Sequence, residues 1–290
     1  MVSRNTLTTA GGAVLMLAAL AACAPADENA AAAPSASASG NNCPPGALQT
    51  KTAGKLTIGT DNPVYEPWFS DNKPSNGKGF ESAVAYQVAQ RLGYSAENVT
   101  WVSVTFNNAI APGPKSFDFD INEFSITDDR KKAVDFSSPY YLVRQTVITT
   151  KGSKIAGATS IADLQTAKLG AQVGTTSYQA ITDVIKPSTK PSVFNNNDDA
   201  KAALVNGTVD GIVVDLPTAF YMTAAELKNG MIVGQLPQVG VPEQFGLLLD
   251  KGSALTGCVS TAVDQLRNDG TLQVLEKTWL AQTGGAPELQ

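Results

Sequence analysis

A serine and an arginine lie five residues apart in a polar segment that could bind an anion. Ser125 supplies a hydroxyl group, and Arg130 supplies a planar fork of N–H donors that fits a carboxylate with two hydrogen bonds. A simpler interpretation pairs Arg130 with one of three nearby aspartates, at positions 128, 129 and 135, on the protein surface. The residue types alone leave both interpretations open.

Two further segments could complete such a site. Gly174 precedes three hydroxyl residues, and the start of a helix near Thr175 and Thr176 would favour an anion, although a plain helix cap is the alternative. Asp215 follows an apolar run, where an unpaired carboxylate is costly to bury, so it could accept an ammonium group or cap a helix. Together, Arg130, Thr176 and Asp215 match the two charges of an α-amino acid.

The elements that must position these residues alternate between strand-like and helix-like segments. Phe80, Val84, Val88 and Leu92 recur every four residues, which predicts a helix with one apolar stripe, and Gly93 marks its end. Strands are expected at 55–60, 99–106, 117–124, 145–150, 168–172, 192–195, 210–214, 231–236 and 245–249, and further helices at 175–185, 198–205, 217–227, 259–266 and 272–279.

This alternation indicates an α/β fold with largely parallel sheets covered by helices, and two successive runs indicate two lobes. Asp198 is expected to cap one helix, and Pro217 is expected in the first turn of another. In open α/β sheets, ligands bind beyond the carboxyl ends of the strands. The candidate residues follow strands, so we expect them to share one cleft.

Composition excludes several classes of function. The sequence has no histidine, which rules out Ser-His-Asp and Cys-His catalysis and the usual zinc sites. The formal net charge is −5, and no arginine-rich run or basic patch stands out, so we expect no nucleic-acid partner. No metal or cofactor is expected. An enzyme that uses a Ser-Lys pair or paired carboxylates stays possible.

The N-terminus is typical of an exported protein. Arg4 precedes an apolar run at 10–22 that is too short to span a bilayer and resembles the core of a signal peptide. The run ends in Leu-Ala-Ala-Cys, which matches the bacterial lipobox and predicts a lipid on Cys23; an ordinary signal peptide cut near Ala22 is the alternative. Residues 24–40 are Ala-, Ser-, Pro- and Asn-rich, as expected for a flexible tether.

Cys43 and Cys258 are the two cysteines that remain besides Cys23. Disulfides persist outside the cytoplasm, so we predict that these two cysteines pair. The bond would join the start of the folded body to a late helix. Two free buried thiols are the alternative.

With these residues considered together, the chain resembles the extracellular solute-binding proteins of family 3, the amino-acid receptors of ABC importers. The resemblance extends from about residue 56 to residue 280. The motifs that carry it are Ile58-Gly59-Thr60-Asp61 with Tyr65 and Pro67, Gly79-Phe80, Ser125-Ile126-Thr127 with Arg130, Val134-Asp135-Phe136-Ser137 with Pro139-Tyr140-Tyr141, Gly174-Thr175-Thr176, and Val209-Asp210 with Asp215.

The resemblance implies a two-lobe periplasmic-binding-protein fold of type II, with two open mixed sheets flanked by helices and joined by a two-strand hinge. We expect the hinge near 142–145 and 241–245, with lobes that close around the ligand. The expected organisation is a signal peptide at 1–22, a lipidated cysteine and tether at 23–47, lobe 1 at 48–143 plus 244–281, lobe 2 at 144–243, and a C-terminal tail at 282–290.

The resemblance also implies roles for individual residues. Arg130, Ser125 and Thr176 would bind the α-carboxylate of the ligand, and Asp215 would bind its α-ammonium group. Tyr65 would cover the ligand and Phe106 would form a wall. The complete set of expected ligand-binding residues is Asp61, Tyr65, Phe106, Glu123, Ser125, Arg130, Gln172, Thr175, Thr176 and Asp215.

Glu123 bears on selectivity, because family members usually carry a small hydroxyl residue there. With Asp61 and Asp215 it would place three carboxylates near one pocket, which would repel an acidic ligand. We therefore expect a basic or other polar L-amino acid. The alternative is that Glu123 faces solvent or pairs with a nearby lysine.

The expected function is that of a substrate-binding lipoprotein, anchored at the extracytoplasmic face of the bacterial membrane through Cys23, that delivers an amino acid to ABC permease subunits without catalysis. Two alternatives use the same fold. One is an enzyme similar to cyclohexadienyl dehydratase, with Glu123 as a general acid. The other is a surface receptor that senses a ligand or acts as an adhesin.

Overall fold

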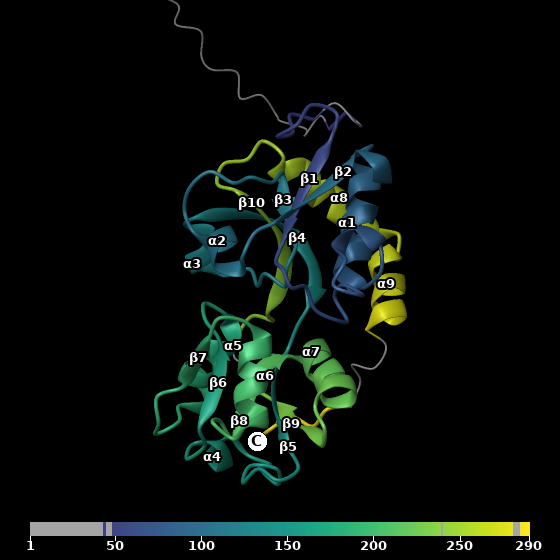
Figure 1. The fold of residues 1–290 in the computed structure, drawn as a ribbon. Coiled ribbons are helices and arrows are strands. Elements are labelled where there is room, and N and C mark those ends of the chain that lie inside the picture. Colours follow the sequence, from purple (N-terminus) through teal and green to yellow (C-terminus); the bar gives the residue numbers. More distant parts are fainter. Residues whose placement is uncertain (1–42, 45–47, 239, 281–284) are drawn as a thin grey trace, which may run out of the picture. The chain divides into compact units, whose positions relative to one another are not determined.

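The computed structural model describes residues 43–44, 48–238, 240–280 and 285–290. The described residues from 48 onward form two five-stranded mixed sheets, each flanked by helices (Figure 1). The expected α/β fold with two mixed sheets is confirmed. The expected signal peptide, Cys23 and residues 24–42 of the tether lie outside the described residues. None of the described helices has the length and hydrophobicity that a bilayer crossing needs.

The first sheet and its helices are called lobe 1. Its strand order is β2-β1-β3-β10-β4, with β1 parallel to β2 and β3, and β10 antiparallel to β3 and β4. Its elements are β1 (Leu56–Thr60), η1 (Pro74–Asn76), α1 (Phe80–Arg91), η2 (Ala96–Asn98), β2 (Val99–Ser103), α2 (Phe106–Ile110), β3 (Phe119–Asp120), α3 (Asp128–Lys131), β4 (Val134–Leu142), β10 (Gln244–Asp250), α8 (Thr256–Asn268) and α9 (Thr271–Trp279).

The second sheet and its helices are called lobe 2. Its strand order is β7-β6-β8-β5-β9, with parallel pairs on both sides of β6 and antiparallel pairs on both sides of β5. Its elements are β5 (Gln145–Thr150), α4 (Ile161–Leu164), β6 (Leu169–Gln172), α5 (Thr176–Ala180), η3 (Ile181–Ile185), β7 (Ser192–Phe194), α6 (Asn197–Val205), β8 (Gly211–Asp215), α7 (Leu216–Tyr221), η4 (Met222–Glu226) and β9 (Gly230–Gln235).

Two chain segments connect the lobes. One runs from β4 to β5 through Val143 and Arg144. The other returns from β9 to β10, and its described residues are 236–238 and 240–243. The Val143 N–H donates to the Glu243 carbonyl over 3.1 Å, so the two segments are hydrogen-bonded side by side. This pair forms the hinge.

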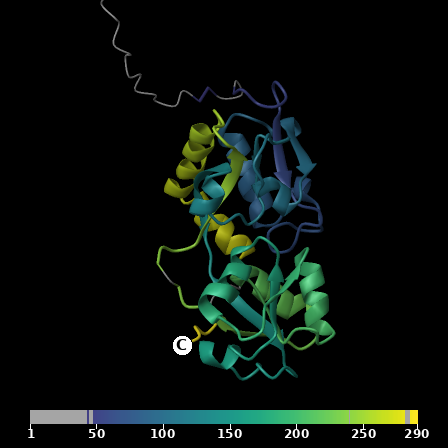
Figure 2. The same ribbon diagram turned by 90° about the vertical axis from the view of Figure 1, so that its left-hand side faces the viewer.

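The described C-terminal residues return to lobe 2, whereas α9 lies on lobe 1. The Gln235 N–H at the end of β9 donates to the Pro287 carbonyl (2.7 Å), and the Leu289 N–H donates to the Gln235 carbonyl (3.0 Å). Leu289 is buried in the core of lobe 2. The C-terminus therefore lies beside the second sheet, as both side views show (Figures 1 and 2). The lobe and tail boundaries expected from the sequence stay a prediction.

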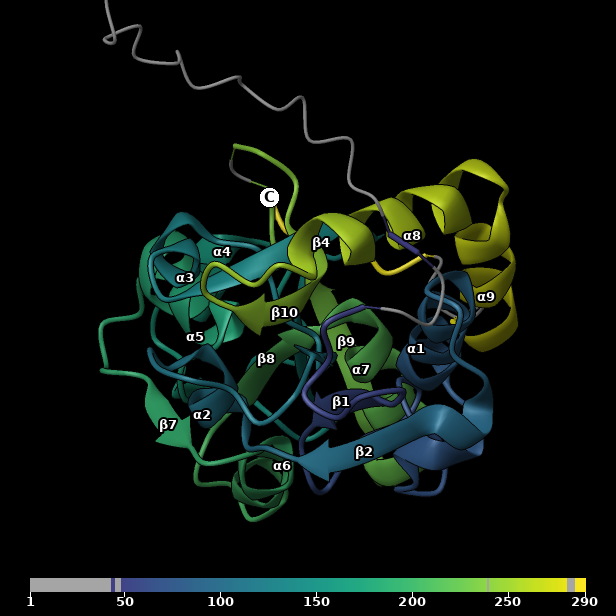
Figure 3. The same cartoon turned by 90° about the horizontal axis from the view of Figure 1, so that it is seen from above.

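Apolar packing forms the core of lobe 1. Phe80, Val84 and Val88 on α1 are fully buried in one cluster with Leu56 and Ile58 of β1, which is the stripe expected from the sequence. On the edge of the sheet, α8 lies along β4 (Figure 3) and binds it through side-chain hydrogen bonds to Ser138. The disulfide predicted from the sequence is present and joins Cys43 to Cys258 of α8.

Some expected elements differ from the structure. Phe106 begins α2 rather than ending a strand, and β3 covers two residues of the expected strand at 117–124. β4 was not among the strands expected from the sequence. Its Pro139 cannot donate to a ladder and is tolerated because β4 is the edge strand of its sheet. Asn196, rather than Asp198, caps α6 by accepting from the Asp199 N–H. Pro217 does lie in the first turn of α7.

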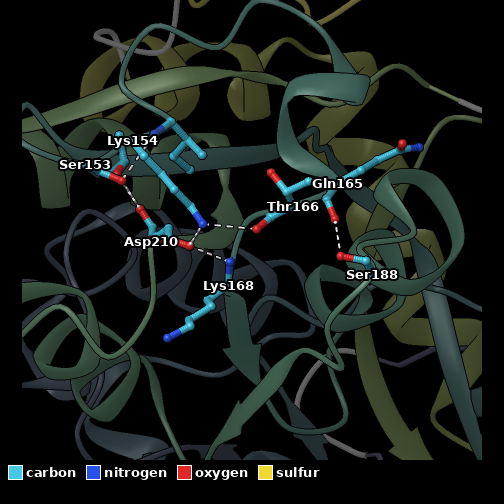
Figure 4. Close-up of polar contacts among 9 residues, drawn as sticks. Ser153, Lys154, Gln165, Thr166, Lys168, Ser188 and Asp210 are labelled. Carbon is cyan, nitrogen blue, oxygen red and sulfur yellow. Dashed lines mark hydrogen bonds and ion pairs between the residues drawn. The ribbon is translucent and has the colours of Figure 1, made fainter.

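Asp210, part of a motif in the sequence, has a structural role at the start of β8. Its Oδ2 accepts from the Lys168 N–H (2.5 Å) and pairs with Lys154 Nζ (3.1 Å), while its carbonyl accepts from Ser153 Oγ (Figure 4). Asp215 ends the same strand. One strand therefore uses a carboxylate at each end, one to join β6 to β8 and the other at the cleft described below.

Gly79 allows α1 to begin directly beneath the loop that carries Trp68. It has φ +92°, and a Cβ there would lie 2.5 Å from the Trp68 carbonyl oxygen and 2.6 Å from Phe69 Cα. Gly79→Ala should destabilise the protein by about 3 kcal/mol or more, measured by denaturant unfolding, because it combines backbone strain with overpacking. Gly54→Ala, at φ +75° with open space, should cost about 1 kcal/mol. Equal losses in the two variants would contradict the prediction.

Candidate functional site

The cleft between the lobes is lined by residues that follow strands or begin helices. The space that water-sized spheres can occupy between these side chains is about 40 Å³, so the two lobes leave only a small space here. The structure brings together nine residues expected from the sequence, namely Asp61, Tyr65, Phe106, Glu123, Arg130, Gln172, Thr175, Thr176 and Asp215. The tenth, Ser125, lies next to the lining, with its Oγ 3.1 Å from Thr176 Oγ1. The ligand-binding set expected from the sequence did not include Asn122, Ser177, Asn197 and Val214, which also line the cleft.

Arg130 is buried and directed toward the cleft. Thr127 caps α3 by accepting from the Arg130 N–H, which fixes the backbone at the start of this short helix. The guanidinium donates from Nη1 to the Ser125 carbonyl (2.7 Å) and from Nη2 to the Gly174 carbonyl (3.0 Å). Its carbon lies 5.2 Å from the centre of the Phe106 ring, a cation–π contact.

The surface ion pair considered for Arg130 is wrong. Asp128 and Asp129 pair with the adjacent lysines at 131 and 132, and Asp135 pairs with Lys251. Burial lowers the pKa of Arg130 to about 10, partly opposed by the charges of Glu243 and Asp215. The guanidinium therefore stays positively charged at neutral pH.

Asp215 ends β8 at the opposite side of the cleft. Its Oδ1 accepts from Gln145 Nε2 over 2.7 Å. It occupies the N-cap position of α7, but its side chain makes no capping hydrogen bond, so the plain helix-cap interpretation is wrong. Burial, followed by the charge of Glu243, raises the pKa of the Asp215 carboxyl, while Gln145 and Arg130 oppose the rise.

The hydroxyl protons near Arg130 already have acceptors. Ser125 Oγ donates to Glu243 Oε1 over 2.6 Å, and a serine hydroxyl has one proton. In the contact between Ser125 and Thr176, the donor is therefore Thr176. Thr175 Oγ1 caps α5 by accepting from the Tyr178 N–H and donates its own proton to the Gln172 carbonyl (2.7 Å). A carboxylate entering this cleft would thus meet Arg130 as its charged donor.

Glu123 faces the cleft, so the solvent-facing and lysine-paired alternatives are wrong. Its Oε2 accepts from Thr218 Oγ1 (3.2 Å), and that hydroxyl accepts from Trp68 Nε1 (2.8 Å). Its backbone N–H donates to Glu81 Oε1 (2.7 Å), which holds the residue at φ +53°. Burial, followed by the charges of Asp215 and Glu81, raises the pKa of the Glu123 carboxyl. The cleft therefore has an excess of carboxyl groups over guanidinium groups.

These acidic groups do not form a metal site. Across the described ranges, no group of three or more Cys, Asp or Glu side chains could hold a metal ion. Each of the carboxyl groups around the cleft accepts hydrogen bonds from protein donors instead, as Asp215 and Glu123 do. The carboxylate oxygens on the acidic side of the cleft therefore act as hydrogen-bond acceptors.

The lobes are in contact across the cleft. Arg130, Ser125 and Trp68 of lobe 1 are hydrogen-bonded to Gly174, Thr176 and Thr218 of lobe 2. A Cβ on Gly174, which has φ +76°, would lie 2.5 Å from Asn107 Oδ1, so a glycine permits the close approach of lobe 2 to α2. Side chains from both lobes can therefore surround a small molecule.

Two mixed sheets, a two-segment hinge and an interlobe cleft define a solute-binding protein of type II. The sequence pattern of the bacterial extracellular solute-binding proteins, family 3, matches residues 56–282, and the chain belongs to this family. Membership confirms the family resemblance and supports a substrate-binding role.

Known relatives agree with this assignment. The ABC transporter glutamine-binding protein GlnH of Bacillus subtilis (strain 168) is 29% identical over 219 residues, covering 74% of this chain and 77% of the relative. A solved ancestral arginine-binding protein bound to arginine is 30% identical, with a TM-score of 0.64, and covers 78% of this chain and 97% of its own. The ancestral amino acid-binding protein AncCDT-1, a precursor of cyclohexadienyl dehydratase, is 33% identical, with a TM-score of 0.64 and coverages of 78% and 95%.

Arg130→Ala should weaken the binding of an L-amino acid by at least about 100-fold, because each hydrogen bond to a charged group contributes about 1.5–3 kcal/mol. The affinity of Arg130→Lys should lie between those of Arg130→Ala and the wild type, since lysine keeps the charge and loses the planar fork. Calorimetry of the wild type and both variants checks this order. An unchanged melting temperature would show that the fold survives, and unchanged affinity in Arg130→Ala would remove this residue from the site.

Proposed function

We propose that this protein is the substrate-binding component of an amino-acid ABC importer and that it holds the ligand between Arg130 and Asp215. The observation that supports this proposal is that these two side chains, of opposite charge and from different lobes, line the same cleft. Arg130 would bind the α-carboxylate and Asp215 the α-ammonium group. Contacts from both lobes favour the closed form when ligand is present. Tyr65 and Phe106 would cover its apolar part.

The ligand we propose is a basic or other polar L-amino acid. Buried carboxyl groups of like charge raise one another's pKa, so an arriving cation relieves their repulsion and favours their ionised forms. An acidic side chain would add to that repulsion. The names of the relatives, which mention arginine and glutamine, support the same range of ligands.

We further propose that the receptor is held at the extracytoplasmic face of the membrane by a lipid on Cys23. The support lies in the sequence, where an apolar run ends in Leu-Ala-Ala-Cys and a tether-like segment follows. An anchor and tether would keep the receptor close to its permease subunits and so raise its effective concentration there.

A thermal-shift screen of the common L-amino acids tests the function. Arginine, lysine, ornithine or glutamine should raise the melting temperature, because a ligand that binds the folded state stabilises it by mass action. Glutamate and aspartate should not. A screen without any shift would contradict the receptor function, and turnover of prephenate or arogenate would favour a dehydratase instead.

Glu123→Gln should reduce the preference for a basic ligand. We expect the affinity for L-arginine relative to L-glutamine to fall about tenfold, which corresponds to about 1.4 kcal/mol of lost attraction between opposite charges. Asp128→Asn is the matched control, because it removes the same charge from a side chain that is 97% exposed. A similar change in both variants, or none in Glu123→Gln, would mean that Glu123 does not set selectivity.

A further inference from the structure

Glu243 in the hinge binds residues from both lobes, although it does not line the cleft. It precedes β10 on the segment that returns from lobe 2. Its carboxylate accepts from Ser125 Oγ of lobe 1 (2.6 Å) and from Gln145 Nε2 at the start of β5 (3.1 and 3.2 Å). Neither Glu243 nor Gln145 was expected from the sequence to act at the site.

Gln145 continues the contacts from Glu243 to the far side of the cleft. This buried amide also donates to Asp215 Oδ1 (2.7 Å), and its Oε1 accepts from Ser177 Oγ (2.7 Å). The hydrogen bonds Ser125–Glu243–Gln145–Asp215 therefore run from the Arg130 side of the cleft to the Asp215 side. They pass through both segments of the hinge, which are themselves joined by the bond from the Val143 N–H to the Glu243 carbonyl.

In each hydrogen bond of this series, the donor and the acceptor are fixed. An ionised carboxylate can only accept, so Ser125 donates to Glu243. The same amide nitrogen of Gln145 donates to two carboxylates, Glu243 and Asp215, and holds them near each other. This arrangement opposes the repulsion between the two like charges, and it exists only when the two hinge segments and both lobes are in register.

We propose that Glu243 and Gln145 are positioning residues that set the charge of Asp215, the proposed ammonium acceptor, from the hinge. This inference rests on the proposed function of Asp215. Its consequence is that ligand affinity depends on pH in a way that the hinge controls, because an ammonium group needs an ionised acceptor.

The sign of this effect follows from the groups that face Asp215. Burial raises its pKa most, and the charges of Glu243 and Glu81 add to the rise, while Gln145 and Arg130 lower it. Glu123 faces Asp215 from lobe 1 and competes for the same proton. Affinity should therefore be highest above the raised pKa of Asp215 and should fall as the pH drops through it.

The experiment measures the dissociation constant of L-arginine by calorimetry between about pH 5 and pH 8 for the wild type and two variants. Glu243→Gln removes a like charge near Asp215, so the loss of affinity at low pH should occur about one pH unit lower than in the wild type. At the lowest pH measured, this variant should therefore bind L-arginine about tenfold more tightly than the wild type. Gln145→Met removes the donor that favours ionised Asp215, so its fall should move to higher pH. Opposite shifts are not expected from general loosening of the hinge.

Glu288→Gln is the matched control. Glu288 is half-exposed near the hinge and pairs with Arg144, so the variant removes one charge from the same region without facing Asp215. Its pH profile should match the wild type. An unmoved profile in Glu243→Gln, or an equal shift in Glu288→Gln, would overturn the proposal even if Gln145→Met failed to fold. Failure of the wild type to bind any amino acid would instead refute the proposed function.

Discussion

The structure depends on the interaction of one guanidinium group with several carboxyl groups that line the same, largely buried cleft. Arg130 comes from lobe 1 and Asp215 from lobe 2, so closing the lobes is what brings the opposite charges to one site. Their mutual effect on pKa shows that they already influence each other, since each favours the charged form of the other. Opposite charges that face the same space can bind a zwitterion in a single orientation.

The hinge is more than a flexible link between the lobes. Its two segments are hydrogen-bonded to each other, and their side chains reach Ser125 on one side and Asp215 on the other. We therefore expect movement of the lobes to change the partners of the residues proposed to hold the ligand. Such coupling uses ordinary hydrogen bonds and like-charge repulsion, and it needs no cofactor.

The carboxyl groups give the site its selectivity in our proposal. Glu123 is held at a positive φ by Glu81 and accepts a hydrogen bond from the Thr218 hydroxyl of lobe 2, so its position depends on both lobes. Water would screen such charges at the surface, but burial strengthens their interaction. The same burial that makes this cluster costly when empty makes it favourable for a positively charged or donor-rich ligand.

The pairing of Cys43 with Cys258 was predicted because they are the two cysteines besides Cys23 and disulfides persist outside the cytoplasm, but the tertiary structure brings them together across 215 residues. The sequence by itself determined the alternation of strands and helices and the residues that follow strands, because hydrophobic periodicity and the geometry of parallel sheets are local rules. Those rules missed β4, whose Pro139 is tolerated at a sheet edge, and they missed Gln145 and Glu243, which begin or precede antiparallel strands. Tertiary structure alone decided those contacts, since they join residues distant in the chain across two lobes and a hinge.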